Sequence, residues 1–345
     1  MSGSRVAVVV LNWNGLEDTL EAVQSLLQQG HAPLDVHVVD NASDNAEADA
    51  IEQRFGDRVT LYRNRENLGF TGGNHTAMRA ALADPQVEFV ALLNNDANAD
   101  PDWISQLVRC AEQDQRIGVV ASLMVFHDVP DVIENTGVEL LRSGEGMPRD
   151  RGRPAAVAAD SGERPIGACG GAVLYRATML REIGLFEEDF FANFEDVELS
   201  LRALATGWDV RYAPAARVRH KLSRSIRKVR DDAFLLRSQR NLLWANYTRL
   251  PWQALLLNLP SILCGHLALL LLAPLVGQRR MARVIWRSRR EFWRDRRAVF
   301  AERRRFAALR TGNWARIWWR QSSFVPRYVR SFLDVVVRRR RRFFE

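Results

Sequence analysis

The sequence lacks the features that mark several classes of protein. Its 345 residues include three cysteines, far apart and without metal-ligand spacing (Cys110, Cys169 and Cys264). This pattern argues against a disulfide scaffold and fits a reducing compartment. The first 15 residues hold too short an apolar run for a signal peptide, and no small-residue cleavage site. No internal repeat is visible either. We therefore expect a protein that faces the cytosol.

Charge is distributed unevenly along the chain. The whole sequence carries 49 Lys+Arg and 41 Asp+Glu, a net charge of +8. Residues 279–345 hold 22 basic residues, all arginine, against 5 acidic ones, so this tail carries +17 and the first 278 residues −9. An acidic body with a basic tail predicts that the tail meets an anionic surface, either membrane or nucleic acid. With 47% apolar residues the body can bury a core, which excludes a disordered chain.

Short apolar runs alternate with helical patterns in the first third of the chain. The strand-like runs cover residues 6–11, 34–39, 59–62 and 87–93. Helical periodicity follows behind Gly15 and at about 46–55, 73–83 and 101–113. This repetition predicts an α/β fold, in which a mostly parallel sheet is flanked by helices. Such sheets bind ligands at the carboxyl ends of their strands.

The remainder of the chain is less regular. Residues 142–164 are rich in Gly, Pro, Arg and Ala, and we interpret them as either a mobile loop or a disordered linker. We expect a helix after the Glu195-Asp196 pair, two short strands between Trp208 and His220, and a long helix over about 227–249. These elements suggest a first domain over 1–225 and a helical, basic C-terminal region over 226–345.

Polar residues follow four of the predicted strands. Each loop alone is ordinary turn chemistry, but four on one sheet edge indicate a binding site. Asp40 could accept hydrogen bonds from a base or ribose, and the glycine-rich turn before Gly73 offers backbone N–H groups to a phosphate. Asp96 could hold a hard divalent cation. The four loops read Asn12-Trp13-Asn14-Gly15, Asp40-Asn41-Ala42-Ser43-Asp44, Asn67-Leu68-Gly69-Phe70-Thr71-Gly72-Gly73-Asn74 and Asn94-Asn95-Asp96.

Five segments in order resemble the inverting family-2 glycosyltransferases, which have the GT-A (Rossmann-like) fold. They are VAVVVLNWNG, VVDNASD, NLGFTGGNH, LLNNDA and GACGGAVLYRATMLREIGLFEEDFFANFEDVELSLRALATGWDVRYAP. The resemblance covers roughly residues 5–225, and five ordered segments are far more specific than one. The chain looks closest to the rhamnosyltransferase-like branch that builds cell-surface polysaccharides.

The resemblance implies a nucleotide-sugar site and a metal site. The nucleotide-sugar residues would be Asn12, Asn14, Asp40, Asn41, Asn74, Asn94 and Asn95. The triplet ending in Asp96 would take the place of the family's Asp-x-Asp metal motif, but here the first acid is Asn94. A site with one carboxylate in place of two binds Mg²⁺ or Mn²⁺ more weakly, but we still expect one of these ions as cofactor. His220 is either a second metal ligand or a structural histidine.

The resemblance also implies the catalytic residues. Glu195 and Asp196 stand where acids often cap a helix, and residue chemistry alone favours that bland interpretation. The match to the family's Glu-Asp motif instead makes Asp196 the general base on the acceptor hydroxyl, with Glu195 orienting the acceptor or Asp196. Small residues before the motif would border the acceptor pocket, or form a plain strand bulge (Cys169, Gly170 and Gly171).

An uncharged stretch separates the body from the basic tail. Residues 254–276 could span a bilayer by length, but Pro260 should interrupt the helix and leave about 24 Å, short of the hydrocarbon core. A crossing would also place the basic tail outside, against the positive-inside tendency. We therefore expect a re-entrant or interfacial hairpin, followed by helices that lie in an anionic interface and interleave Arg with Trp286, Trp293, Trp314, Trp318 and Trp319. The alternative is a buried helical subdomain with a solvated basic face.

These observations predict a transferase at the cytoplasmic face of the plasma membrane, peripheral or monotopic. It would move a sugar, with dTDP-rhamnose as one candidate donor, to a lipid-linked or cell-surface glycan. A nucleic-acid-binding protein could also use the Arg/Trp tail, but it has no need of an uncharged apolar stretch. An inactive GT-A scaffold is a third interpretation, against which the presence of both Asp96 and Asp196 argues.

Overall fold

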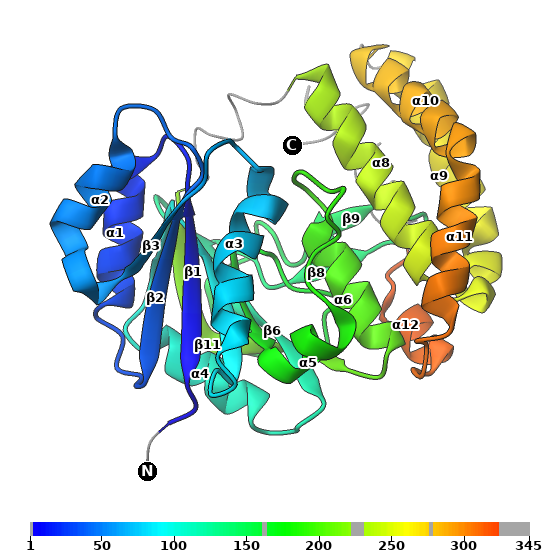
Figure 1. Cartoon of the computed structure of the whole chain (residues 1–345). Helices are drawn as coiled ribbons and strands as arrows, with labels where there is room; N and C mark the ends of the chain where they lie inside the picture. The colour runs from blue at the N-terminus through cyan, green and yellow to red at the C-terminus, as the bar shows by residue number, and fades with distance from the viewer. Residues whose placement is uncertain (1–2, 161–163, 222–230, 276–278, 324–345) are drawn as a thin grey trace.

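The protein is built around one large mixed sheet. The computed structural model describes residues 3–160, 164–221, 231–275 and 279–323 (Figure 1). In the described part, nine strands form this sheet in the order β3-β2-β1-β4-β10-β6-β11-β5, with β7 paired to β6. The strands are β1 (Val6–Asn12), β2 (Leu34–Asp40), β3 (Thr60–Arg63), β4 (Phe89–Asn94), β5 (Ala97–Ala99), β6 (Ile117–Phe126), β7 (Ile133–Asn135), β10 (Ala172–Arg176) and β11 (Asp209–His220).

The sheet is parallel in its first half, as the strand–helix alternation predicts. β1 pairs in parallel with β2 and β4, and β2 pairs in parallel with β3. β10 is inserted antiparallel between β4 and β6, while β6 and β11 are parallel. The two short strands expected between Trp208 and His220 are instead the single strand β11, which has a register shift between Ala213 and Arg217. This irregularity interrupts the alternation that we interpreted as two strands.

Helices cover both faces of the sheet, because alternate residues of each strand point to opposite sides. Ala7 and Val9 belong to one core, with side chains of α3 (Gly69–Ala83), α5 (Ala177–Ile183) and α6 (Glu195–Ala205). Val6, Val8 and Val10 belong to the other, with α1 (Leu16–Leu26), α2 (Glu47–Phe55) and α4 (Trp103–Ala111). A 3-10 turn, η1 (Gly56–Arg58), follows α2. This is the three-layer α/β arrangement predicted from the sequence.

Residues 142–164 are structured where they are described. A hairpin joins β8 (Val138–Leu140) to β9 (Gly146–Pro148), and a 3-10 helix, η2 (Ala155–Asp160), follows. Arg149 is buried, and the hydroxyl of Thr136 donates a hydrogen bond to Asp150 at 2.7 Å. The expectation of a disordered linker is therefore wrong for these residues, which form an irregular segment with one short strand and a 3-10 helix, while 161–163 lie outside the described part. A composition rich in Gly and Pro did not reveal the long-range contacts that order the segment.

Five helices form a further layer beside α6. They are α8 (Asp232–Arg249), α9 (Trp252–Leu275), α10 (Arg279–Arg294), α11 (Arg296–Ala307) and α12 (Trp314–Arg320). α8 packs against α6, while α10 and α11 pack against α8, as Figure 1 shows. α9 runs unbroken through Pro260, so the predicted interruption is wrong. None of the helices described is both long enough and apolar enough to cross a membrane. Residues 324–345 of the basic tail lie outside the described residues.

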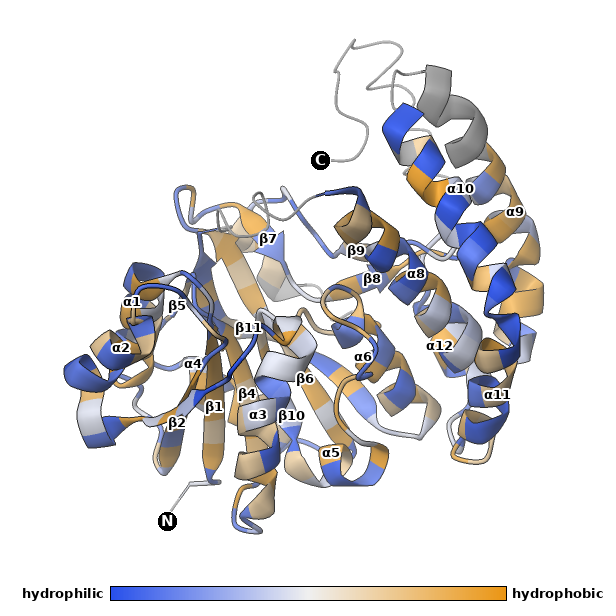
Figure 2. Ribbon diagram, turned by 45° about the horizontal axis from the view of Figure 1, so that its top comes forward, coloured by the Kyte–Doolittle hydropathy of each residue, from blue (hydrophilic) through white to orange (hydrophobic). Residues whose placement is uncertain are grey.

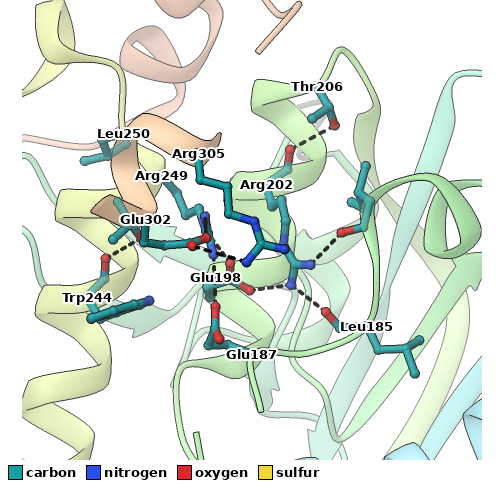
Figure 3. Close-up of polar contacts among 12 residues, drawn as sticks. Leu185, Glu187, Glu198, Arg202, Thr206, Trp244, Arg249, Leu250, Glu302 and Arg305 are labelled. Carbon is teal, nitrogen blue, oxygen red and sulfur yellow. Dashed lines mark hydrogen bonds and ion pairs between the residues drawn. The ribbon is translucent and has the colours of Figure 1, made fainter. Parts of the chain in front are cut away.

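A buried ionic cluster joins this layer to α6. Glu198 is fully buried and accepts hydrogen bonds from Arg202 at 2.6 Å and from Arg249 of α8 (Figure 3). Arg249 also reaches Glu187 at 3.0 Å and Glu302 of α11 at 2.8 Å. Burial alone would raise the pKa of Glu198, but the two guanidinium groups outweigh it and lower the pKa. The start of α6 is thereby tied to α8 and α11.

Candidate active site

Asp196 lies in the first turn of α6, at the edge of the sheet. One carboxylate oxygen accepts a hydrogen bond from the backbone N–H of Gly170 at 2.9 Å, and the other accepts from the N–H of Val197 at 2.7 Å. These contacts hold the half-buried carboxylate in one orientation. Burial raises the pKa of Asp196, and the N–H groups only partly oppose it. A positioned carboxylate with a raised pKa is suited to accept a proton.

Glu195 precedes it and is more deeply buried. Its Oε2 has no hydrogen-bond partner among the residues that the structure describes. Burial, followed by the negative charge of Asp196, raises the pKa of Glu195. Two neighbouring buried carboxyls do not readily share two negative charges, so the pair favours an ionised Asp196 beside a protonated Glu195. Both acids lie in the first turn of α6, where acidic side chains are favoured, so their position fits the helix-end interpretation as well as the catalytic one.

The small residues before β10 allow Phe70 and Asn94 to lie close to the backbone at this point. A Cβ at Gly170 would lie 3.2 Å from the ring of Phe70, and one at Gly171 would lie 3.0 Å from Nδ2 of Asn94. The backbone N–H of Asn94 donates to the carbonyl of Gly171 at 2.8 Å, and β10 pairs regularly with its neighbours. The strand bulge considered for these glycines is therefore not seen. Burial raises the pKa of the Cys169 thiol, which keeps it unreactive.

Asp96 and His220 face each other where β5 pairs with the end of β11. Nε2 of His220 lies 3.0 Å from Oδ1 of Asp96 and 3.5 Å from Nδ2 of Asn94. Its Nδ1 lies 2.7 Å from Oε2 of the buried Glu134. Burial alone would lower the pKa of His220, but its hydrogen bonds to Asp96 and Glu134 outweigh this effect and raise it to about 10.

A carboxylate and an imidazole are residue types that bind divalent cations, so Asp96 and His220 could serve as two ligands. Here their 3.0 Å contact is a hydrogen bond, and Nε2 of His220 would have to release its proton to bind a cation. No group of three or more His, Cys, Asp or Glu that could hold a metal occurs within the described residues. The remaining ligands would therefore be diphosphate oxygens and water, as is usual for Mg²⁺ with nucleotides.

Glu134 is a site residue that the sequence reasoning missed. It lies in the three-residue strand β7, within a stretch whose pattern looked irregular. A metal-binding histidine commonly gives its second ring nitrogen to a carboxylate, which fixes the tautomer and orients the ring. The local sequence, Asp131-Val132-Ile133-Glu134-Asn135, gave no signal that sets Glu134 apart. Glu134 and His220 are 86 residues apart in sequence, so no local pattern indicates their hydrogen bond.

The loops that follow β1 and β2 are joined to each other by hydrogen bonds. Nδ2 of Asn12 donates to Asp40 at 2.9 Å and to Glu47 at 2.9 Å, and both Asn12 and Asp40 are buried. Asn14 has a positive φ of 52° and exchanges two hydrogen bonds with Asp44. Asp40 also accepts from the N–H of Ser43, so each of its oxygens already has a protein donor. These residues shape the edge of the predicted nucleotide site.

Two residues predicted to touch the ligand are engaged in holding the third loop. Asn41 is buried, donates to Asn67 and Gly69, and accepts from Asn64 and Leu68, which uses its amide fully. Asn74 is buried within α3 and donates to the carbonyl of Phe70 at 2.8 Å. Asn41 therefore has no free group for a ligand in this arrangement, while the contact of Asn74 engages its Nδ2.

The third loop also differs from the predicted phosphate cradle. α3 begins at Gly69, four residues before the predicted start, so Gly73 lies inside the helix. The N–H of Gly69 donates to Asn67, and that of Thr71 donates to the carbonyl of Phe191. The turn therefore does not present these N–H groups to a phosphate. Asn95 is similarly turned toward α1, where it donates to the hydroxyl of Thr19 at 3.1 Å.

The site residues therefore fall into two groups. Asp196, Gly170, Gly171, Asn94, Asp96 and His220 form one continuous set of contacts, while Asn41, Asn74 and Asn95 support the loops around it. An acid at a helix start and an Asp–His pair, on an α/β sheet of this order, agree with the GT-A glycosyltransferase class that the sequence motifs predict.

Comparison with known sequences assigns the family. The sequence model described as "Glycosyltransferase like family 2" matches residues 4–241, and the chain belongs to this family. It is accordingly an enzyme that transfers a sugar from a nucleotide-sugar donor.

Two curated relatives act on lipid carriers according to their names. An N-acetylglucosaminyl-diphospho-decaprenol L-rhamnosyltransferase of Mycobacterium tuberculosis is 29% identical over 212 residues, which are 56% of this chain and 68% of that protein. A glucosyl-dolichyl phosphate glucuronosyltransferase of Haloferax volcanii is 31% identical over 125 residues, which are 35% of this chain and 38% of that one.

Solved structures agree on the fold. A mannosyltransferase of Pyrobaculum calidifontis in complex with GDP-Man and Mn²⁺ has a TM-score of 0.51 at 17% identity, covering 83% of this chain and 74% of that one. GalNAc-T7 with UDP, GalNAc and Mn²⁺ has a TM-score of 0.53 at 14% identity, covering 70% of this chain and 47% of the other.

Proposed function

We propose that this enzyme transfers a hexose, with L-rhamnose from dTDP-rhamnose as the first candidate, to a lipid-linked glycan acceptor. The support is the rhamnosyltransferase of M. tuberculosis, whose alignment covers 68% of its length and whose name describes a decaprenol-linked acceptor. The second relative, by its name, also acts on a polyprenyl-type carrier. A lipid-linked acceptor lies in a bilayer, so we expect the enzyme to act at the cytoplasmic face of the plasma membrane.

The proposed reaction is a single displacement that inverts the anomeric carbon, as is consistent with family 2. Asp196 accepts the proton of the acceptor hydroxyl as that oxygen attacks, and the N–H groups of Gly170 and Val197 keep its carboxylate oriented. The neutral Glu195 avoids a second charge beside the base. Asp96 and His220 would hold Mg²⁺ or Mn²⁺, which offsets negative charge on the departing nucleoside diphosphate.

One observation carries the proposal. The base and the cation pair belong to the same contact chain, which runs from Asp196 through Gly170 and Gly171 to Asn94 and on to His220. An inverting transferase needs its base and its leaving-group cation on opposite sides of one sugar ring, only a few ångströms apart. A chain kept solely as a scaffold would have no need of this juxtaposition.

A two-stage experiment tests the proposal. A panel of nucleotide sugars is first screened by thermal shift with and without Mn²⁺. The stabilising donor is then incubated with an N-acetylglucosaminyl-diphospho-polyprenol acceptor, and the linkage of the product is determined by NMR. We expect stabilisation by dTDP-rhamnose that increases with Mn²⁺, followed by transfer with inversion. Stabilisation by a different nucleotide sugar would overturn the donor assignment, and no stabilisation by any of them would contradict the function.

A further inference from the structure

The outer side of the C-terminal helices carries a regular exposed pattern that the transfer reaction does not use. Seven exposed side chains follow one another along α10 and α11 at alternating spacings of three and four residues. This spacing places them on one side of each helix. Arginine and aromatic residues alternate strictly, and we call the seven residues the arginine–aromatic stripe: Arg283, Trp286, Arg290, Trp293, Arg297, Phe300 and Arg304.

The stripe lies opposite the packed side of these helices. Phe292 and Val299 are buried against Leu243 of α8, which α10 and α11 cover. By contrast, the rings of Trp286, Trp293 and Phe300 are 54–64% exposed. Three large exposed rings on one line are unusual for a surface that meets only water, and they indicate a contact surface.

The neighbouring helix α9 extends the apolar surface. It contacts α10, and Figure 2 shows the apolar α9 beside the largely hydrophilic α10. Five of its exposed apolar side chains recur every three or four residues and are each 46–59% exposed: Trp252, Leu256, Leu259, Leu263 and Leu267. Leu257, which follows Leu256, is 52% exposed as well. One side of α9 is therefore an apolar strip without a partner in the described chain.

Charge identifies what this surface can contact. α10 and α11 together contain twelve arginines and two acidic residues, Glu291 and Glu302. Both acids are paired with arginine, Glu291 with Arg287 and Glu302 with Arg249, and Asp295 between the helices is paired with Arg294. The surface therefore presents a strong excess of guanidinium groups, which bind phosphate well, next to exposed leucines.

We propose that the arginine–aromatic stripe, with the exposed side of α9, docks the enzyme on an anionic phospholipid bilayer. Arginines of the stripe contact lipid phosphates, the aromatic rings lie at the headgroup level, and the α9 leucines enter the acyl boundary. Nucleic acid would satisfy the arginines and rings but not the leucines, whereas an anionic bilayer satisfies all three. The inference rests on the proposed function only in that a lipid-linked acceptor lies in such a membrane.

The structure corrects which tryptophans take part. Trp318 is half-buried, donates from Nε1 to Asn258 at 3.0 Å, and carries the guanidinium of Arg142 over its ring at 3.9 Å. Trp314 is half-buried as well. The ring of Trp318 belongs to internal packing, so the interface prediction is wrong for it, whereas for Trp314 it stays a prediction. Trp286 and Trp293 stay in the proposed surface, and Phe300 joins them.

The position of this surface suits the reaction. α11 packs on α8, and α8 packs on α6, which begins with Glu195 and Asp196. Two helix-packing distances of about 8–10 Å each place the catalytic helix about 20 Å inside the docked face. The head of a lipid-linked acceptor therefore has a short path from the bilayer to Asp196.

Vesicle flotation of the full chain tests the inference. Vesicles of phosphatidylcholine alone are compared with vesicles that also contain phosphatidylglycerol. One variant changes four stripe arginines to glutamine, and a matched control makes the same change at four exposed arginines of the catalytic body. The stripe variant is R283Q/R290Q/R297Q/R304Q, and the control is R54Q/R58Q/R65Q/R109Q.

We expect the wild-type chain and the control to float with the anionic vesicles only. The stripe variant should bind them about 100-fold more weakly, because each arginine near an anionic surface contributes substantially to binding. A second variant, W286A/W293A/F300A, should lose the part of the binding that persists in high salt. Circular dichroism and thermal unfolding confirm that each variant is folded.

Three results would overturn the inference: flotation of the stripe variant at the wild-type level, an equal loss in the control, or tighter binding to duplex DNA or RNA than to vesicles. Failure of the proposed function appears separately, in transfer to a water-soluble acceptor analogue in detergent. The stripe variants should match the wild-type rate there. If the wild-type chain transfers no sugar at all, the proposed function fails while the flotation result still stands.

Discussion

Replacing Asp196 by asparagine tests the assignment of the base most directly. The substitution keeps the shape of the side chain but removes its ability to take a proton. General base catalysis typically contributes about 10²–10⁴-fold, so we expect kcat to fall by at least about 100-fold. Asp96 and His220 are untouched, and affinity for the donor should therefore change by less than about 3-fold.

The hydrogen bonds of Asp196 add a second, smaller consequence. Both of its oxygens accept from backbone N–H groups, those of Gly170 and Val197. An asparagine can present its oxygen to only one of them, so its NH₂ group must face the other donor. A buried donor left unpaired costs about 1–3 kcal/mol, and we expect this loss in the free energy of unfolding. The variant should remain folded, because this cost is smaller than typical domain stability.

The measurement separates these effects. Transfer is followed in single turnover with saturating donor, donor affinity by calorimetry, and stability by urea unfolding. The matched control is Asp189→Asn, which makes the same chemical change at an exposed carboxylate in the loop before α6 and should leave all three quantities unchanged. If folded Asp196→Asn kept more than one tenth of the wild-type kcat, Asp196 would not be the base.

Three further predictions follow from the geometry. Glu134→Gln should weaken Mn²⁺ binding, measured by calorimetry with the nucleoside diphosphate present, by about 10–100-fold, because the amide orients His220 less strongly; unchanged affinity would count against this role. Arg249→Met leaves the buried Glu198 short of a partner and should lower the free energy of unfolding in urea by about 3–5 kcal/mol. Arg79→Met, in an exposed pair with Glu188, should change it by less than about 1 kcal/mol, and equal losses would refute the reasoning. The base must be ionised, and burial raises the pKa of Asp196, so kcat/KM should rise with pH along an acid limb above about pH 4; an acid limb at or below that pH would contradict the burial argument.

Much of the catalytic body could be predicted because its signals are local. The first four strands occur within two residues of their predicted starts, because a short apolar run is by itself a local signal of a buried strand. Asp196 was found by its motif, and its helix begins at Glu195, as expected. Asp96 and His220 were both predicted, although their 3.0 Å contact comes from pairing between β5 and β11.

The errors have one physical origin. Asn41 looks like a ligand residue because amides and glycines cluster around it, yet long-range contacts with the third loop use its amide. Residues 142–164 look structureless because their order depends on partners such as the hairpin strand β8 and not on local propensity. Pro260 was expected to break a helix, but α9 continues through it within a layer of packed helices.

The sequence by itself determined the family, the mostly parallel half of the sheet, the candidate for the catalytic acid and the separation of acidic body from basic tail. Each of these is encoded in short-range order along the chain, as a motif, a period or a count of charges. Only the tertiary structure decided that Glu134 orients His220, that Glu198 ties α6 to α8 and α11, and which arginines and aromatic rings face outward. These features depend on which distant residues meet, because burial and pairing are properties of the packed molecule and not of any segment of it.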